Sequence, residues 1–147
     1  MRSLYSLIAA LVLGSPPAAA GEPAVLVFSK TAGYRHVSIE DGVAMLRDLG
    51  REQGFAVEHS EDAGLFSDDS LPRFAAVVFL STTGDVLDAG QQRSFERYIR
   101  NGGAYLGIHA AADTEYDWPW YVGLVGAWFD GHPEIQAADV VVEDPRH

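Results

Sequence analysis

Three short, uninterrupted apolar runs constrain the fold of this chain more than any other feature. They cover residues 24–28, 74–80 and 104–108, and each is followed by a polar or glycine-rich loop. Runs without polar alternation are typical of strands buried on both faces of a parallel sheet. With a shorter strand expected over residues 55–59, they predict an α/β protein with parallel strands.

Two amphipathic helices are predicted between these strands. Ser38 is expected to cap the first, with Asp41 completing a weak capping box, and Gly54 is expected to end it. Asp88 is expected to cap the second helix, which runs to about Asn101 before two glycines. Residues 60–73 form a polar connection. The order of elements predicts three layers, with helices on both sides of the sheet.

The region after residue 117 is predicted to hold a short helix over residues 118–126, a loop over 127–133 and a strand over 135–142. Because the chain ends at His147, soon after that strand, we expect a domain that is incomplete at its C-terminus. A sheet that is cut short leaves an unpaired edge, which favours self-association into a homo-oligomer.

The first 20 residues have the features of a cleaved signal peptide. Arg2 precedes an apolar stretch over residues 4–13, and Ala18-Ala19-Ala20 fits a cleavage site before Gly21. The apolar stretch is short for a bilayer span, and no second segment is long enough for one. We therefore expect export to the periplasm or the exterior, with residues 21–147 as one domain.

The charge and the cysteine count exclude several classes of function. Cleavage would remove Arg2 and leave 9 basic against 21 acidic residues, a net charge of −12. An acidic surface of this kind repels nucleic-acid phosphates and favours a neutral or cationic small ligand. The chain has no cysteine, which excludes disulfides, cysteine nucleophiles and cysteine-ligated metals.

Polar segments follow three of the predicted strands, over residues 30–36, 81–85 and 109–117. Ligands of open parallel sheets bind at the carboxyl ends of the strands, where these segments meet. His109 is the strongest candidate, because it directly follows a buried strand and has Gly107 before it and three alanines after it. Small neighbours of this kind suit a nucleophile elbow, here with a histidine. His109 is predicted to be a general acid/base or a metal ligand, or else a structural histidine.

Four motifs in order, over residues 27–36, 78–85, 102–111 and 120–133, resemble the ThuA-like (trehalose utilisation) family. The resemblance extends over residues 24–146 and implies a flavodoxin-like sheet of the class I glutamine amidotransferase-like type. Related amidotransferases have a catalytic cysteine at the position of His109, and because this chain has no cysteine, their thiolate mechanism is excluded here. It implies a role in disaccharide or keto-sugar metabolism, and a sugar ligand.

The candidate site residues are assigned on these grounds. The predicted catalytic residues are His109, His36 and Asp113, the last to orient His109 or bind a hydroxyl group. The predicted substrate-binding residues are Tyr34, Arg35, Thr83, Asp85, Trp120 and His132. His36, His109 and His132 together offer three imidazoles, which suit zinc with an open position. Each assignment has a structural alternative, and we expect Glu115 in a solvated acidic loop.

Three functions from different classes follow from these observations. The first is an exported enzyme of the hydrolase or isomerase type that acts on a sugar or an oxidised sugar. The second is a non-catalytic carbohydrate-binding module, and the third is a structural domain of a larger exported assembly.

Overall fold

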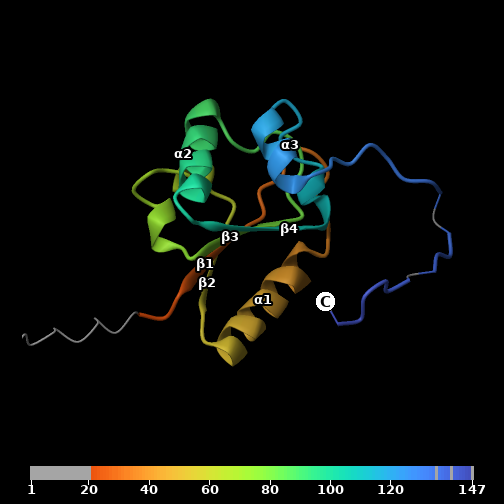
Figure 1. Cartoon of the computed structure of the whole chain (residues 1–147), viewed down its shortest axis with the longest axis horizontal. Helices are drawn as coiled ribbons and strands as arrows, with labels where there is room; N and C mark the ends of the chain where they lie inside the picture. The colour runs from red at the N-terminus through yellow and green to blue at the C-terminus, as the bar shows by residue number, and fades with distance from the viewer. Residues whose placement is uncertain (1–20, 135, 140, 147) are drawn as a thin grey trace, which may run out of the picture.

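A four-stranded parallel sheet lies at the centre of the molecule (Figure 1). Its strands are β1 (Ala24–Phe28), β2 (Ala56–Ser60), β3 (Ala76–Leu80) and β4 (Ala104–Ile108), in the order β2-β1-β3-β4. The structure, a computed structural model, describes residues 21–134, 136–139 and 141–146. The signal peptide predicted over residues 1–20 lies outside the described residues. The parallel α/β prediction is confirmed, and flavodoxin-like sheets begin with the same strand order.

Helices cover both faces of the sheet, as predicted (Figure 1). Helix α1 (Ile39–Gln53) packs on one face, while α2 (Ala89–Arg100) and α3 (Pro119–Val125) lie over the other. Successive residues of a strand point to opposite faces. Val27 therefore packs in the cluster with α1, whereas Leu26 and Phe28 belong to the larger cluster beneath α2 and α3.

The helix ends follow local sequence signals, with one exception. Gly54 ends α1 with a φ of 77°, and Asp88 forms a complete capping box with Gln91 at the start of α2. The predicted cap at Ser38 is wrong, because Ser38 makes no side-chain capping bond. Its φ of −76° and ψ of −3° are helical, whereas a capping side chain needs an extended backbone to reach the amides of the first turn.

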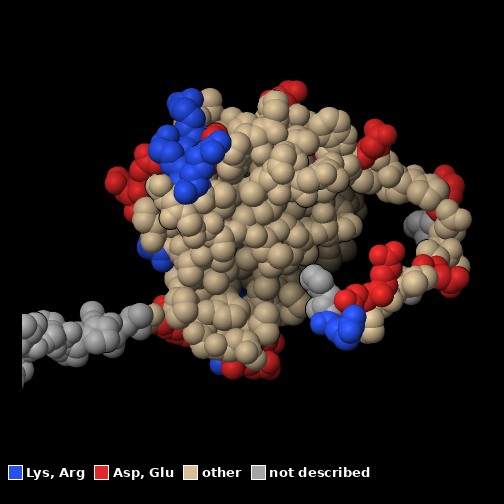
Figure 2. Space-filling view, in the orientation of Figure 1, with Lys and Arg blue, Asp and Glu red and all other residues tan. Residues whose placement is uncertain are grey.

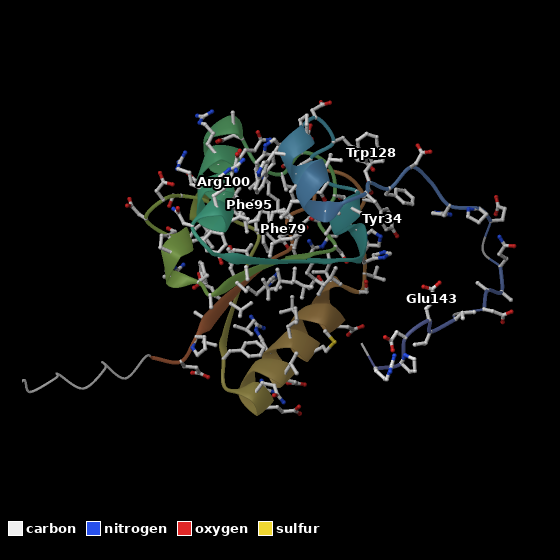
Figure 3. The ribbon with its side chains drawn as sticks, in the orientation of Figure 1. Tyr34, Phe79, Phe95, Arg100, Trp128 and Glu143 are labelled. Atoms are coloured by element: carbon white, nitrogen blue, oxygen red, sulfur yellow. The ribbon has the colours of Figure 1, made fainter. Side chains whose placement is uncertain are left out.

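The connection between β2 and β3 contains two 3₁₀ turns, η1 (Ala63–Leu65) and η2 (Leu71–Arg73). The strand predicted over residues 135–142 is wrong for the described part of that range, where residues 136–139, 141 and 142 have no strand pairing. The segment loops out beside the sheet and turns back toward the side of α1, with Glu143 on the returning part (Figure 3), and Val141 is 79% exposed. A strand requires a neighbouring backbone for its hydrogen bonds, and this segment has none within the described residues.

None of the helices seen in residues 21–134, 136–139 and 141–146 combines the length and apolar character that a bilayer span requires.

Candidate functional site

Three loops meet where the parallel strands end. The loop after β1 joins the loop after β3 through the amide of Ala32, which donates to the carbonyl of Thr83 over 2.7 Å. The loop after β3 joins the loop after β4 through the amide of Gly84, which donates to the carbonyl of Asp113 over 2.8 Å. These bonds extend the order of the sheet beyond its strands, so the polar segments 30–36, 81–85 and 109–117 lie together as predicted.

A cavity of about 690 Å³ opens at the carboxyl ends of the strands, where these loops meet. Figure 3 shows two of its aromatic residues, Tyr34 and Trp128, on the same side of the molecule. The residues that line it are Tyr34, His36, His109, Ala110, Ala112, Asp113, Trp128, Phe129 and His132. Its size lies within the range of about 300–1,000 Å³ that is usual for small-molecule sites.

His109 lies at the junction between β4 and the short turn η3 (His109–Ala112). Its φ of 54° is in the left-handed region, which non-glycine residues adopt rarely and often at functional sites. Gly107 gives the turn the space that it needs, because a Cβ there would lie 2.7 Å from the hydroxyl oxygen of Tyr105. This backbone leaves the His109 side chain exposed at the cavity.

His36 packs against His109 although 72 residues separate them in the sequence. The ring centroids lie 4.6 Å apart with an interplanar angle of 83°, and the Tyr34 ring lies 4.9 Å from His36 on a similar edge-to-face contact. Nδ1 of His36 is buried and has no hydrogen-bond partner among the described residues. The two imidazoles therefore form a contacting pair at the cavity.

Asp113 lines the same cavity and contacts Tyr116. The Tyr116 hydroxyl oxygen lies 2.5 Å from Oδ1 of Asp113 and 2.7 Å from the carbonyl oxygen of Phe129. Loss of solvent around this hydroxyl, followed by its bond to Asp113, raises the pKa of Tyr116 to about 12. Tyr116 thus stays protonated at ordinary pH.

The three histidines predicted as a zinc site do not assemble into one. His132 lines the cavity, but its Nδ1 lies 2.9 Å from the carbonyl oxygen of Pro133 and its ring faces Phe129 at 6.0 Å. Within the part of the chain that the structure describes, no three histidine, aspartate or glutamate side chains are grouped to hold a metal ion. The donor set of His36, His109 and His132, in this arrangement, does not fit zinc.

Two of the predicted substrate-binding residues hold the loop after β1 instead of lining the cavity. Arg35 forms exposed ion pairs with Glu61 at 2.8 Å and Glu40 at 2.9 Å; the hydrogen bond to Glu61 is the largest cause of its raised pKa. Thr83 is buried, and its hydroxyl donates to the carbonyl of Tyr34 over 2.9 Å. Both contacts fix the backbone on which Tyr34 and His36 stand.

Two further predicted binding residues lie elsewhere. Asp85 is exposed and does not line the cavity. Trp120, on α3, packs against the core and stacks on Trp118 at 5.0 Å, so its ring supports the cover of the sheet. Tyr34, His36, His109, Asp113 and His132 are the predicted residues that the structure brings to the cavity.

Glu115 corrects one expectation, because it is 1% exposed and not part of a solvated acidic loop. Its Oε1 accepts the backbone amides of Val86 and Leu87, both at 2.8 Å, and its Oε2 accepts the side-chain amide of Gln92 at 2.7 Å. The carboxylate joins the loop after β4 to the start of α2.

Trp128, Phe129 and Tyr116 were not predicted as site residues. The sequence signal that could have indicated the first two is an aromatic pair in a predicted loop without helix or strand periodicity. Aromatic rings placed where no regular element can bury them are candidates for a ligand surface. Trp128 is 56% exposed and Phe129 is 42% exposed.

Comparisons with known proteins add to this geometry. A model of the protein family described as ThuA, trehalose utilisation, matches residues 24–147. The chain is also similar to the crystal structure of a ThuA-like protein from Bacteroides uniformis, with 25% sequence identity and a TM-score of 0.62. That similarity covers 76% of this chain and 46% of the other, so the chain spans less than half of the matched structure. A comparison with curated proteins gives no match.

Proposed function

The chain belongs to the ThuA (trehalose utilisation) family, and from this premise we propose that its cavity binds an uncharged sugar, with His109 as the acid/base group. The main support for this proposal is that the His36–His109 pair and exposed aromatic rings line the same cavity. Aromatic faces with a few convergent polar groups are the usual lining of a small-molecule site.

The charge around the cavity favours an uncharged ligand. Among the residues that the structure describes, no lysine or arginine lines it, whereas the Asp113 carboxylate does. Arginines gather instead over α2 on the face shown in Figure 2, at the other end of the sheet from the cavity. A phosphorylated or acidic sugar would be repelled by this acidic protein and would find no basic side chain among the residues that line the cavity.

Each polar side chain at the cavity has a role that its position supports. His109 would give or take a proton at its imidazole, because this side chain is exposed and lines the cavity. His36 would contact the sugar through the part of its imidazole ring that lines the cavity. Asp113 would accept a hydrogen bond from a neighbouring sugar hydroxyl group. The proposed reaction is an acid–base step on a sugar, as in a hydrolase or an isomerase. It uses no thiol nucleophile, because the chain has no cysteine.

Three variants test this proposal with trehalose and its keto derivatives as probes. Trp128→Ala should weaken binding in calorimetry by about tenfold or more, as expected for an exposed aromatic anchor. Trp120→Ala is the matched control and should leave the affinity within about twofold, because Trp120 lies outside the cavity. His109→Ala should lower turnover by about 10²–10⁴-fold.

The outcomes separate the candidate functions. Turnover that survives His109→Ala would contradict the assigned role of His109. Binding that requires Trp128, in a protein that turns over none of the probes, would favour a non-catalytic carbohydrate-binding module. Equal loss of binding in the Trp128 and Trp120 variants would contradict the placement of the sugar in this cavity.

We also propose that the protein is exported, on the basis of the signal-peptide features of residues 1–20.

A further inference from the structure

The loop over residues 127–132, which we call the aromatic loop, forms one wall of the cavity with few attachments. It has no helix or strand, and its residues are exposed. Among the described residues, and apart from the contact of His132 with the adjacent Pro133, two hydrogen bonds join it to the rest of the chain. The amide of Phe129 donates to the carbonyl of Ala112 over 2.8 Å, and the carbonyl of Phe129 accepts the Tyr116 hydroxyl over 2.7 Å.

We propose that Tyr116 is a positioning residue that holds the aromatic loop over the His36–His109 pair. This inference rests on the proposed function, because it explains how the sugar-binding surface of the same cavity is kept in place. Tyr116 itself does not line the cavity. It acts through Phe129, whose neighbour Trp128 supplies an exposed aromatic face there.

The chemistry of the Tyr116 hydroxyl suits this role. One hydroxyl proton is shared by two acceptors, Oδ1 of Asp113 and the carbonyl oxygen of Phe129. The contact with Asp113, at 2.5 Å, is the shorter of the two, and the contact with Phe129, at 2.7 Å, is the one that reaches the aromatic loop. Any tyrosine keeps its hydroxyl proton near neutrality, and the raised pKa of Tyr116, about 12, extends this to more alkaline pH.

The contact also connects the two sides of the cavity. Asp113 directly follows the turn that begins at His109, whereas Phe129 belongs to the aromatic loop. Tyr116 therefore fixes the distance between the acid/base side of the cavity and its aromatic side. Without the hydroxyl, one bond remains at Phe129, and we expect the loop to detach more often.

Hydrogen exchange in the ligand-free protein tests the contact directly. In Tyr116→Phe, which keeps the ring and removes the hydroxyl, the Phe129 amide should exchange about tenfold faster than in the wild type. Tyr98→Phe is the matched control, because it removes a buried hydroxyl that donates to the carbonyl of Phe74, far from the aromatic loop. An unchanged Phe129 exchange rate in Tyr116→Phe, or an equal increase in both variants, would overturn the proposal.

Binding of trehalose, measured by calorimetry, distinguishes this inference from the proposed function. If the wild type binds trehalose, Tyr116→Phe should weaken that binding by about tenfold while Tyr98→Phe leaves it unchanged. Unchanged affinity in Tyr116→Phe would overturn the positioning role. If the wild type does not bind the sugar, the proposed function fails, and the Phe129 exchange rate alone decides whether Tyr116 holds the loop.

Discussion

The substitution Glu115→Ala tests how much a buried carboxylate contributes to the framework of the site. Glu115 accepts the amides of Val86 and Leu87 on Oε1 and the side chain of Gln92 on Oε2. It thereby joins the loop that follows His109 to the start of α2. Alanine at this position removes all three bonds and leaves a small void in a buried region.

The magnitude follows from the groups that lose a partner. Val86 and Leu87 are buried, so water cannot easily replace the carboxylate at their amides, and each unpaired buried amide costs about 1–3 kcal/mol. Gln92 is half-buried and can turn toward solvent. Both glutamate and alanine are strained at a φ of 56°, so the backbone adds little to the difference. We expect a loss of about 2–5 kcal/mol in the free energy of unfolding.

Urea unfolding, followed by circular dichroism and tryptophan fluorescence, measures this loss. Glu115→Gln keeps an oxygen acceptor and should lose less, about 1–2 kcal/mol. The matched control is Asp117→Ala, which removes an exposed carboxylate two residues further on and should change stability by less than about 0.5 kcal/mol. Equal stability of Glu115→Ala and Asp117→Ala would refute the reasoning.

Two further predictions concern pH and processing. Burial lowers the pKa of His59, and the positive charge of Arg47 lowers it further, so the unfolded chain binds the histidine proton more tightly than the folded one. The free energy of unfolding should therefore fall as the pH drops from 7 to 5, and it should fall less in His59→Asn. Urea midpoints measured at both pH values would show this. If export and cleavage occur as proposed, N-terminal sequencing of the exported protein should begin at Gly21, and an intact Met1 would contradict the signal peptide.

The fold was predictable from the sequence because its signals are local. Each apolar run forms a strand, and Asp88 and Gly54 act on amides and carbonyls within a few residues of themselves. Burial on both faces is confirmed for most of β1 and β3 but was wrong for β4, which lies at the end of the strand order and leaves Leu106 51% exposed. Ser38 failed as a cap because its own backbone angles are helical, which the residue type does not reveal. The strand expected over residues 135–142 depended on a neighbouring backbone, which is not a local property.

The sequence predicted where the candidate site lies, but it did not predict all of the residues that line it. Strand ends could be located, so His109, His36 and Asp113 were placed at one edge of the sheet, where the structure brings them to one cavity. Arg35 was expected at the rim but pairs with Glu61 instead. Trp128 was not expected at the cavity at all.

The sequence by itself therefore determined the α/β class, the sheet edge that bears the site and the absence of thiol chemistry. Only the tertiary structure decided which side chains face the cavity and which ones hold the loops. The physical reason is that a side chain's direction depends on partners far away in the chain, as in the contact between His36 and His109 at 4.6 Å. Glu115 shows the same dependence. Its buried carboxylate needs the amides of Val86 and Leu87, in the loop before α2, as hydrogen-bond donors.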